Sequence, residues 1–119
     1  MIELEALERC AEFKVSNAKA RLEEYREKLA STPHYALDWG IEMFKAAANL
    51  EVWGRVLAKK GQRAASNESI VLRFADISLR EAINGARWPA WSTEPSSNLI
   101  HECTTAAWAD LYCEIMGNL

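Results

Sequence analysis

The chain has 119 residues, half of them hydrophobic and 26% charged, a mixture that argues against a disordered or fibrous protein. Five glycines and three prolines are too few for a turn-rich all-β domain, and a net charge of −3 gives no general attraction to nucleic acid. No window holds 18 consecutive apolar residues, so we expect no membrane span. These features predict a single globular domain over residues 1–119.

Residues 2–30 carry the pattern of one long amphipathic helix. Apolar side chains recur every three or four residues and form one stripe: Leu4, Leu7, Ala11, Val15, Ala18, Leu22, Tyr25 and Leu29. Glutamates, lysines and arginines fill most of the positions between them. Ser16 and Asn17 mark a point where the helix could bend, because short polar side chains compete for backbone hydrogen bonds.

The second predicted helix covers residues 33–60, with Thr32 as its N-cap, Pro33 at its first position and Gly61 after its last turn. Its apolar residues form two neighbouring stripes: Ala36, Trp39, Met43, Ala46, Leu50, Trp53 and Leu57, and then Ile41, Phe44, Ala48, Val52 and Val56. A helix that is apolar over so wide an arc is covered from more than one side. We therefore interpret it as the central helix.

The third predicted helix covers residues 68–86, with Ser66 or Asn67 as its N-cap. We expect one apolar flank to face the core: Leu72, Ala75, Leu79, Ala82 and Ile83, extended by Ile70, Phe74 and Ile77. The opposite face is polar: Arg73, Asp76, Arg80, Asn84 and Arg87.

The fourth predicted helix begins after a cap at Ser96 or Ser97 and ends at Met116, before Gly117. Its inward stripe contains Ile100, Cys103, Ala107, Leu111 and Ile115, with Trp108 and Tyr112 alongside. No segment alternates in the manner of a strand. The predicted fold class is all-α: a four-helix bundle-like domain in which two long N-terminal helices form a hairpin and two shorter helices follow.

The predicted helices are long for a compact domain. A 119-residue globule has a radius of gyration of about 13–14 Å, whereas an unbroken helix of about 28 residues is about 42 Å long. Either the long helices break, at Ser16–Asn17 or Gly40, or their uncovered surface meets another chain. We expect a homodimer with its seam between Trp39 and Leu57, where the apolar spacing is tight. An ordinary internal core is the alternative use of that stripe.

One acidic run has the spacing of a metal-binding element. In Glu23-Glu24-Tyr25-Arg26-Glu27, Glu23 or Glu24 lies one helical turn from Glu27, and such carboxylates could hold Mg²⁺. The run resembles half of the signature of the MazG-type all-α nucleoside triphosphate pyrophosphohydrolases. That family carries a second E-x-x-D element on a neighbouring helix, which this sequence lacks. An Mg²⁺-dependent pyrophosphohydrolase is thus an alternative function, and a solvated helix face is the interpretation that we favour.

Positive charge is concentrated in the middle of the chain. Residues 52–87 contain seven bases and three acids, whereas residues 88–119 contain four acids and no base. Arg73, Arg80 and Arg87 recur every seven residues and therefore share one helix face. They are candidate residues for an anionic small molecule, a nucleotide or an acidic protein surface. Alternatively, this cluster pairs with the acidic last helix of the same chain.

Two of the five tryptophans, Trp88 and Trp91, lie in a proline-containing loop that follows Arg87. Rigid exposed indoles are good binding anchors, and tryptophan together with arginine is the usual composition of interface hot spots. We therefore name Trp88 and Trp91 as candidate partner- or ligand-binding residues. The alternative is that both indoles fold back and close the end of the bundle.

No complete catalytic constellation is recognisable and no CxxC or HxxxH spacing occurs, so we expect no enzyme, cofactor or metal. The three cysteines, Cys10, Cys103 and Cys113, are an odd number without close spacing, which favours reduced thiols in the cytoplasm. The acidic first residues lack the features of a signal peptide. We predict a small non-enzymatic protein-interaction module, an adaptor or inhibitor such as a phage-type accessory protein, that forms a homodimer. A binder of an anionic small molecule, using the arginine face and the tryptophan loop, is the alternative.

Overall fold

The computed structural model describes residues 1–31, 36–58, 66–87 and 95–117. They form four helices: α1 (Leu4–Ser31), α2 (Ala36–Leu57), α3 (Asn67–Arg87) and α4 (Pro95–Met116). No strand occurs in these ranges, which confirms the all-α, bundle-like class. None of these helices is both long and apolar enough to cross a membrane.

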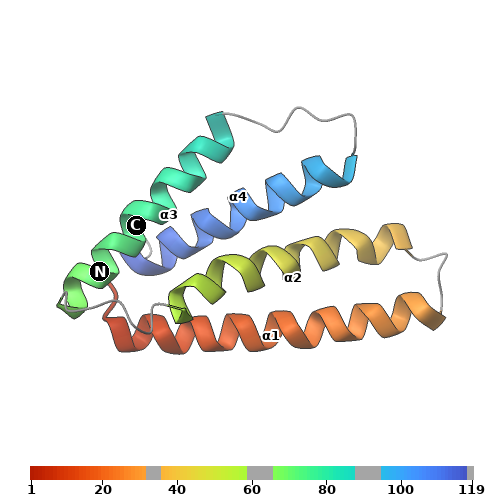
Figure 1. Cartoon of the computed structure of the whole chain (residues 1–119), viewed down its shortest axis with the longest axis horizontal. Helices are drawn as coiled ribbons and strands as arrows, with labels where there is room; N and C mark the ends of the chain where they lie inside the picture. The colour runs from red at the N-terminus through yellow and green to blue at the C-terminus, as the bar shows by residue number, and fades with distance from the viewer. Residues whose placement is uncertain (32–35, 59–65, 88–94, 118–119) are drawn as a thin grey trace.

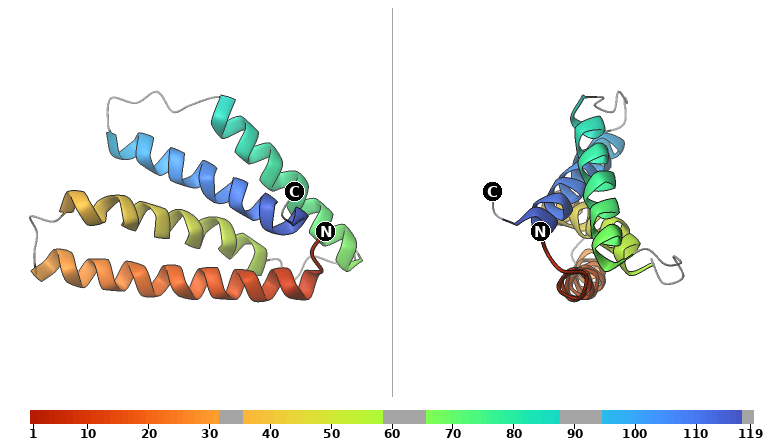
Figure 2. Two further views of the ribbon diagram at one scale, coloured as in Figure 1. Left: turned by 180° about the vertical axis from the view of Figure 1, so that it is seen from behind. Right: turned by 90° about the vertical axis from the view of Figure 1, so that its left-hand side faces the viewer.

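Successive helices run in alternating directions, and α1 and α2 form the expected hairpin (Figure 1). The order across the molecule is α1, α2, α4, α3, so that α2 packs against α1 on one side and α4 on the other (Figure 2). The prediction that α2 is covered from more than one side is confirmed. The helix α3 lies at the edge of this arrangement, where α4 is its main neighbour and α1 touches it far less.

Both long helices are continuous at the positions where the sequence suggested a break, Ser16–Asn17 in α1 and Gly40 in α2. The molecule is accordingly elongated, 50 × 31 × 28 Å, with a radius of gyration of 15.7 Å. The predicted C-terminal end of the second helix was too late, because α2 ends at Leu57 and Ala58 is already in a turn, whereas the predicted first residues 33–35 lie outside the described part of the chain. The predicted Thr32, Pro33 and Gly61 signals lie outside the described residues.

The other helix boundaries show which capping signals operate. Ser66 caps α3, because its Oγ accepts a hydrogen bond from the backbone N–H of Ser69 at 3.2 Å. The predicted caps of α4 are wrong, since the helix already begins at Pro95. Proline is well tolerated at a first helical position, where the missing N–H would have no partner within the helix. Gly117, with φ +80°, follows the last residue of α4, in agreement with the predicted end.

The hydrophobic core occupies one end of the molecule. It is built from the first half of α1 and α3 and the second half of α2 and α4: Leu4, Leu7, Ala11, Val15, Ala48, Val52, Trp53, Val56, Ile70, Val71, Phe74, Ala75, Ala107, Trp108, Leu111 and Ile115. At this end the four helices converge, and towards the hairpin tip α3 and α4 lean away from the α1–α2 hairpin (Figure 1). The N-terminus is fastened here by a hydrogen bond from the Ile2 N–H to the Ile115 carbonyl, at 2.8 Å.

The predicted core flank of α3 is partly wrong. Its buried residues are Ile70, Val71, Phe74, Ala75 and Ser78. Leu72, Leu79 and Ile83, which we expected inside, are 52%, 38% and 45% exposed. Apolar residues cover more than half of the circumference of α3, and an edge helix can bury only the part that faces its neighbour. For a similar reason Ile100, at the divergent end of α4, is 48% exposed.

The stripe proposed as a dimer seam is divided between core and surface. Val52, Trp53 and Val56 are fully buried within the chain, so this part of the stripe forms an ordinary internal core. At the other end of α2, Trp39 is half-buried and Ile41 is 42% exposed. Only the N-terminal half of the seam is therefore left for another chain.

Candidate functional site

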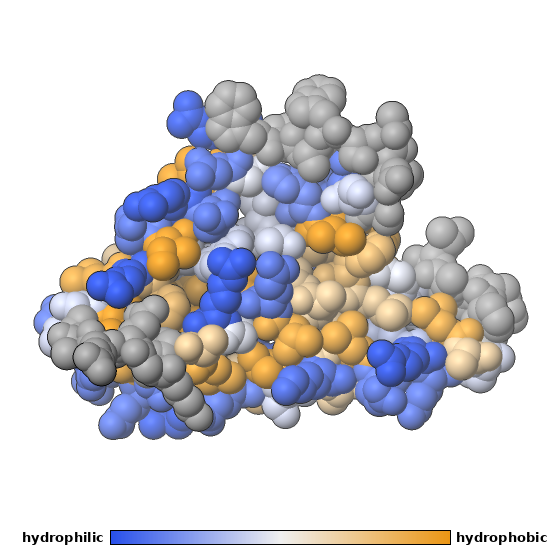
Figure 3. All heavy atoms as spheres, viewed as in Figure 1, coloured by the Kyte–Doolittle hydropathy of each residue, from blue (hydrophilic) through white to orange (hydrophobic). Residues whose placement is uncertain are grey.

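Three of the predicted site residues border an exposed apolar stripe on α3. Leu79 follows Leu72 by seven residues and Ile83 follows Leu79 by four, so the three side chains share one side of the helix. The neighbouring arginines run along one edge of this stripe. We call this set the α3 outer face: Leu72, Arg73, Leu79, Arg80, Ile83 and Arg87. In the surface view, apolar and hydrophilic residues are interspersed over α3 (Figure 3).

The spacing of the arginines decides what they can bind. Seven residues of helix rise about 10 Å, so Arg73 and Arg87 are separated by about 21 Å along the axis. Arg80 lies between them and forms an ion pair with Asp76 at 2.7 Å. The three groups therefore do not converge on one small anion, and they fit an elongated partner.

One alternative from the sequence was that the arginines of α3 pair with acidic residues of the last helix. Arg80 and Asp110 have other partners. Asp110 of α4 pairs instead with Lys14 of α1 at 3.2 Å, whereas Arg80 pairs within α3. Arg87 is exposed and is the last residue of α3. Trp88 and Trp91 lie outside the described residues.

The acidic run on α1 is an exposed face with local ion pairs. Glu24 pairs with Lys28 at 2.9 Å, and the hydrogen bond from Lys28 lowers the pKa of Glu24 below its ordinary value. Glu23 lies 3.9 Å from Arg26, and Glu27 is exposed. Among the described residues, no three histidine, cysteine or acidic side chains are grouped so that they could hold a metal ion.

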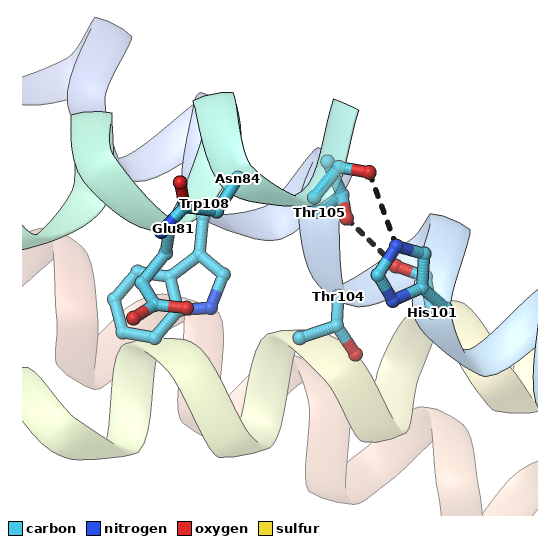
Figure 4. A pocket seen from close by; sticks show the side chains of 7 residues that line it. Glu81, Asn84, His101, Thr104, Thr105 and Trp108 are labelled. Carbon is cyan, nitrogen blue, oxygen red and sulfur yellow. Dashed lines mark hydrogen bonds between the residues drawn. The ribbon is translucent and has the colours of Figure 1, made fainter. Parts of the chain in front are cut away.

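A second candidate site, which the sequence did not reveal, is a cavity of about 410 Å³ between α3 and α4. Figure 4 shows Glu81 and Asn84 on α3 and the other labelled side chains on α4. The lining residues are Glu81, Asn84, Gly85, His101, Thr104, Thr105 and Trp108. The cavity is of the size that small ligands use.

The hydrogen bonds around this cavity fix the direction of several donors. The Gly85 carbonyl can only accept, so His101 donates to it through Nε2, at 3.1 Å. Thr105 Oγ1 donates to the His101 carbonyl at 2.9 Å, and Thr104 Oγ1 donates to the Ile100 carbonyl at 2.8 Å. The hydroxyl oxygens and Nδ1 of the neutral imidazole are therefore left as acceptors.

Gly85 sets the separation of the two helices beside the cavity. A Cβ at this position would overlap the side chain of Thr105, so only glycine allows this approach. The contact joins residues 20 positions apart, on helices whose mutual orientation no local pattern predicts. Within the sequence, the only available signal was a glycine inside a helical period, which often marks a close contact.

The three cysteines are free thiols. Burial raises the pKa of Cys10 and of Cys103 above the ordinary thiol value, and nearby Glu114 adds to the effect at Cys10. Both groups therefore have less thiolate at neutral pH than an ordinary thiol, which makes them poor nucleophiles. Cys103 is half-buried on its predicted stripe.

Comparison with protein-family models, with curated proteins and with solved structures finds no significant match for this chain.

Proposed function

We propose that this chain is a small non-enzymatic protein-interaction module, an adaptor or inhibitor that binds a protein partner through the α3 outer face. The observation that carries the proposal is the exposure of Leu72, Leu79 and Ile83 on one side of an edge helix. Leu79 and Ile83 are one turn apart and Leu72 lies two turns before Leu79, and apolar side chains grouped on one helix side mark interaction surfaces more often than isolated ones do.

The charges on this face favour an acidic partner. Arg73, Arg80 and Arg87 lie beside the apolar stripe, and Arg80 forms an ion pair with Asp76. A partner helix with apolar residues on one side and carboxylates at its edges would match both features over the length of α3. A second copy of α3 fits less well, because antiparallel self-pairing brings Arg73 near Arg87 of the other chain.

The test is Leu79→Glu, which removes apolar area and repels an acidic partner. We expect it to weaken partner binding at least about thirtyfold, as for a hot-spot residue that contributes about 2 kcal/mol. Partners are captured on immobilised protein, identified by mass spectrometry and titrated against each variant. Raising the salt concentration should weaken the wild-type complex, because the arginine contacts are screened.

Phe13→Glu is the matched control. Phe13 is 68% exposed on α1, outside the α3 outer face, and its replacement introduces the same charge. It should retain the partner, and both variants should keep the wild-type melting temperature to within a few degrees. Equal binding by wild type and Leu79→Glu would contradict the proposal.

We further propose that the chain forms a homodimer through the divergent end of α2 and α4. A groove of about 400 Å³ lies there, and its apolar lining includes Ile41, Leu99, Cys103 and Ala106. Ile41 is the exposed continuation of the stripe whose other half forms the core. Burying it against a second chain would cover the part of the hairpin that α3 and α4 leave open.

Sedimentation equilibrium tests this homodimer. We expect the wild type to sediment at twice the chain mass of 13.4 kDa and Ile41→Glu to sediment at the monomer mass. Leu79→Glu serves as the control and should remain dimeric, because the two surfaces are separate. A wild-type monomer at high protein concentration would contradict this part of the proposal.

A further inference from the structure

We propose that the cavity between α3 and α4 binds a guanidinium group, as a site separate from the α3 outer face. Glu81 lies about 200° around α3 from Leu79, since each residue advances the helix by about 100°. The Glu81 side of the cavity and the apolar stripe of the outer face are therefore on different sides of α3, and Asn84 lies between them, beside the arginine edge.

The hydrogen-bonding groups of the cavity favour a ligand that is rich in donors. The hydroxyl hydrogens of Thr104 and Thr105 are used by backbone carbonyls, and His101 Nε2–H is used by Gly85. The two hydroxyl oxygens and Nδ1 of the neutral ring keep lone pairs that can accept hydrogen bonds from a ligand. Asn84 adds an amide, which can accept as well as donate.

The charge of the cavity favours a cation. Glu81 is the one acidic residue among the described lining residues, and no lysine or arginine is among them. A carboxylate binds a guanidinium through two parallel N–H···O bonds, a geometry that an ammonium group cannot match. Of the common organic cations, a guanidinium therefore satisfies the most acceptors at once.

The indole of Trp108 supplies a surface suited to the same group. The ring already stacks with a guanidinium from within the chain, since the Arg55 guanidinium carbon lies 5.2 Å from its centroid. Arg55 is a nearby like charge for an incoming cation, and Glu51, at 3.6 Å from Arg55, offsets it. Arg55 comes from α2 and is not among the residues that line the cavity.

Titration with methylguanidinium, followed by the amide and indole NMR signals of the protein, tests the site. We expect saturable shifts centred on Gly85, Thr105 and Trp108, with no comparable response to methylurea, which has a similar shape but no charge. Glu81→Gln should weaken methylguanidinium binding at least about tenfold, because it removes the charged acceptor. Glu68→Gln is the matched control, an exposed glutamate on the same helix outside this cavity, and should bind as the wild type does.

A comparison of two further ligands shows whether the guanidinium comes from a free metabolite or from a protein side chain. Tighter binding of agmatine indicates a free metabolite, whereas tighter binding of a capped arginine amide indicates an arginine side chain of another protein. Either result supports a guanidinium site. The proposal is overturned if methylguanidinium gives no saturable shifts, if methylurea binds equally well, or if Glu81→Gln leaves the affinity unchanged. None of these results bears on Leu79→Glu, which tests the α3 outer face.

Discussion

Replacing Trp53 with alanine is expected to lower the free energy of unfolding by about 3–5 kcal/mol, as for other buried aromatic residues. Trp53 has no exposed surface and packs in the core where the four helices converge. A domain of this size is stable by about 5–15 kcal/mol, so the loss is a large part of the total. Urea unfolding followed by far-ultraviolet circular dichroism measures it.

Trp39→Ala is the matched control, because Trp39 lies on the same stripe of α2 but is half-buried near the hairpin tip. Its ring packs beside Lys28, whose Nζ is 5.6 Å from the ring centroid. We expect a loss of about 1–2 kcal/mol, since less apolar area leaves the protein interior. Equal losses for the two variants would contradict a core that is confined to one end.

Replacing Gly85 with alanine is expected to lower the free energy of unfolding by about 1–2 kcal/mol. Overpacking costs about 1–3 kcal/mol, and the higher helix propensity of alanine returns up to about 1 kcal/mol. The added methyl group would meet Thr105 and force α3 away from α4. Calorimetric melting curves measure the change.

The same substitution at Gly54 should have the opposite sign. Apart from the backbone of its own helix and its chain neighbours, no described atom lies within 4 Å of the place that a Cβ would take there, so Gly54→Ala should stabilise the protein by about 1 kcal/mol. The double variant Gly85→Ala with Thr105→Ala should recover much of the Gly85→Ala loss, because the smaller side chain makes room. Strictly additive effects of the two changes would contradict a direct contact between these positions.

Local patterns were sufficient to predict α1. Its apolar residues recur every three or four positions and form a single stripe along one side of the helix. The buried residues all belong to this stripe: Leu4, Leu7, Ala11, Val15, Ala18 and Tyr25. The predicted number of helices and the central place of α2 also followed from the width and spacing of apolar stripes.

The outer face of α3 could not be predicted in the same way. Leu72 and Leu79 belong to an apolar arc that is continuous with the buried Ala75. The spacing of apolar residues along the sequence gives the width of this arc, but it does not say which part of the arc packs against another helix. Which half is buried depends on the order of the helices, and this order is a tertiary property. The cavity at Gly85 and His101 depends on the same order, together with a close helix crossing.

The confinement of the core to one end has a consequence for how this sequence can change. Substitutions in the convergent half disturb close packing, whereas most exposed positions near the hairpin tip tolerate change within about 0.5 kcal/mol. Residues such as Ile41 and Ile100 are therefore free to vary without loss of the fold. The convergent half therefore contributes most of the close packing, and the exposed positions of the other half have the latitude to adapt to a new binding partner.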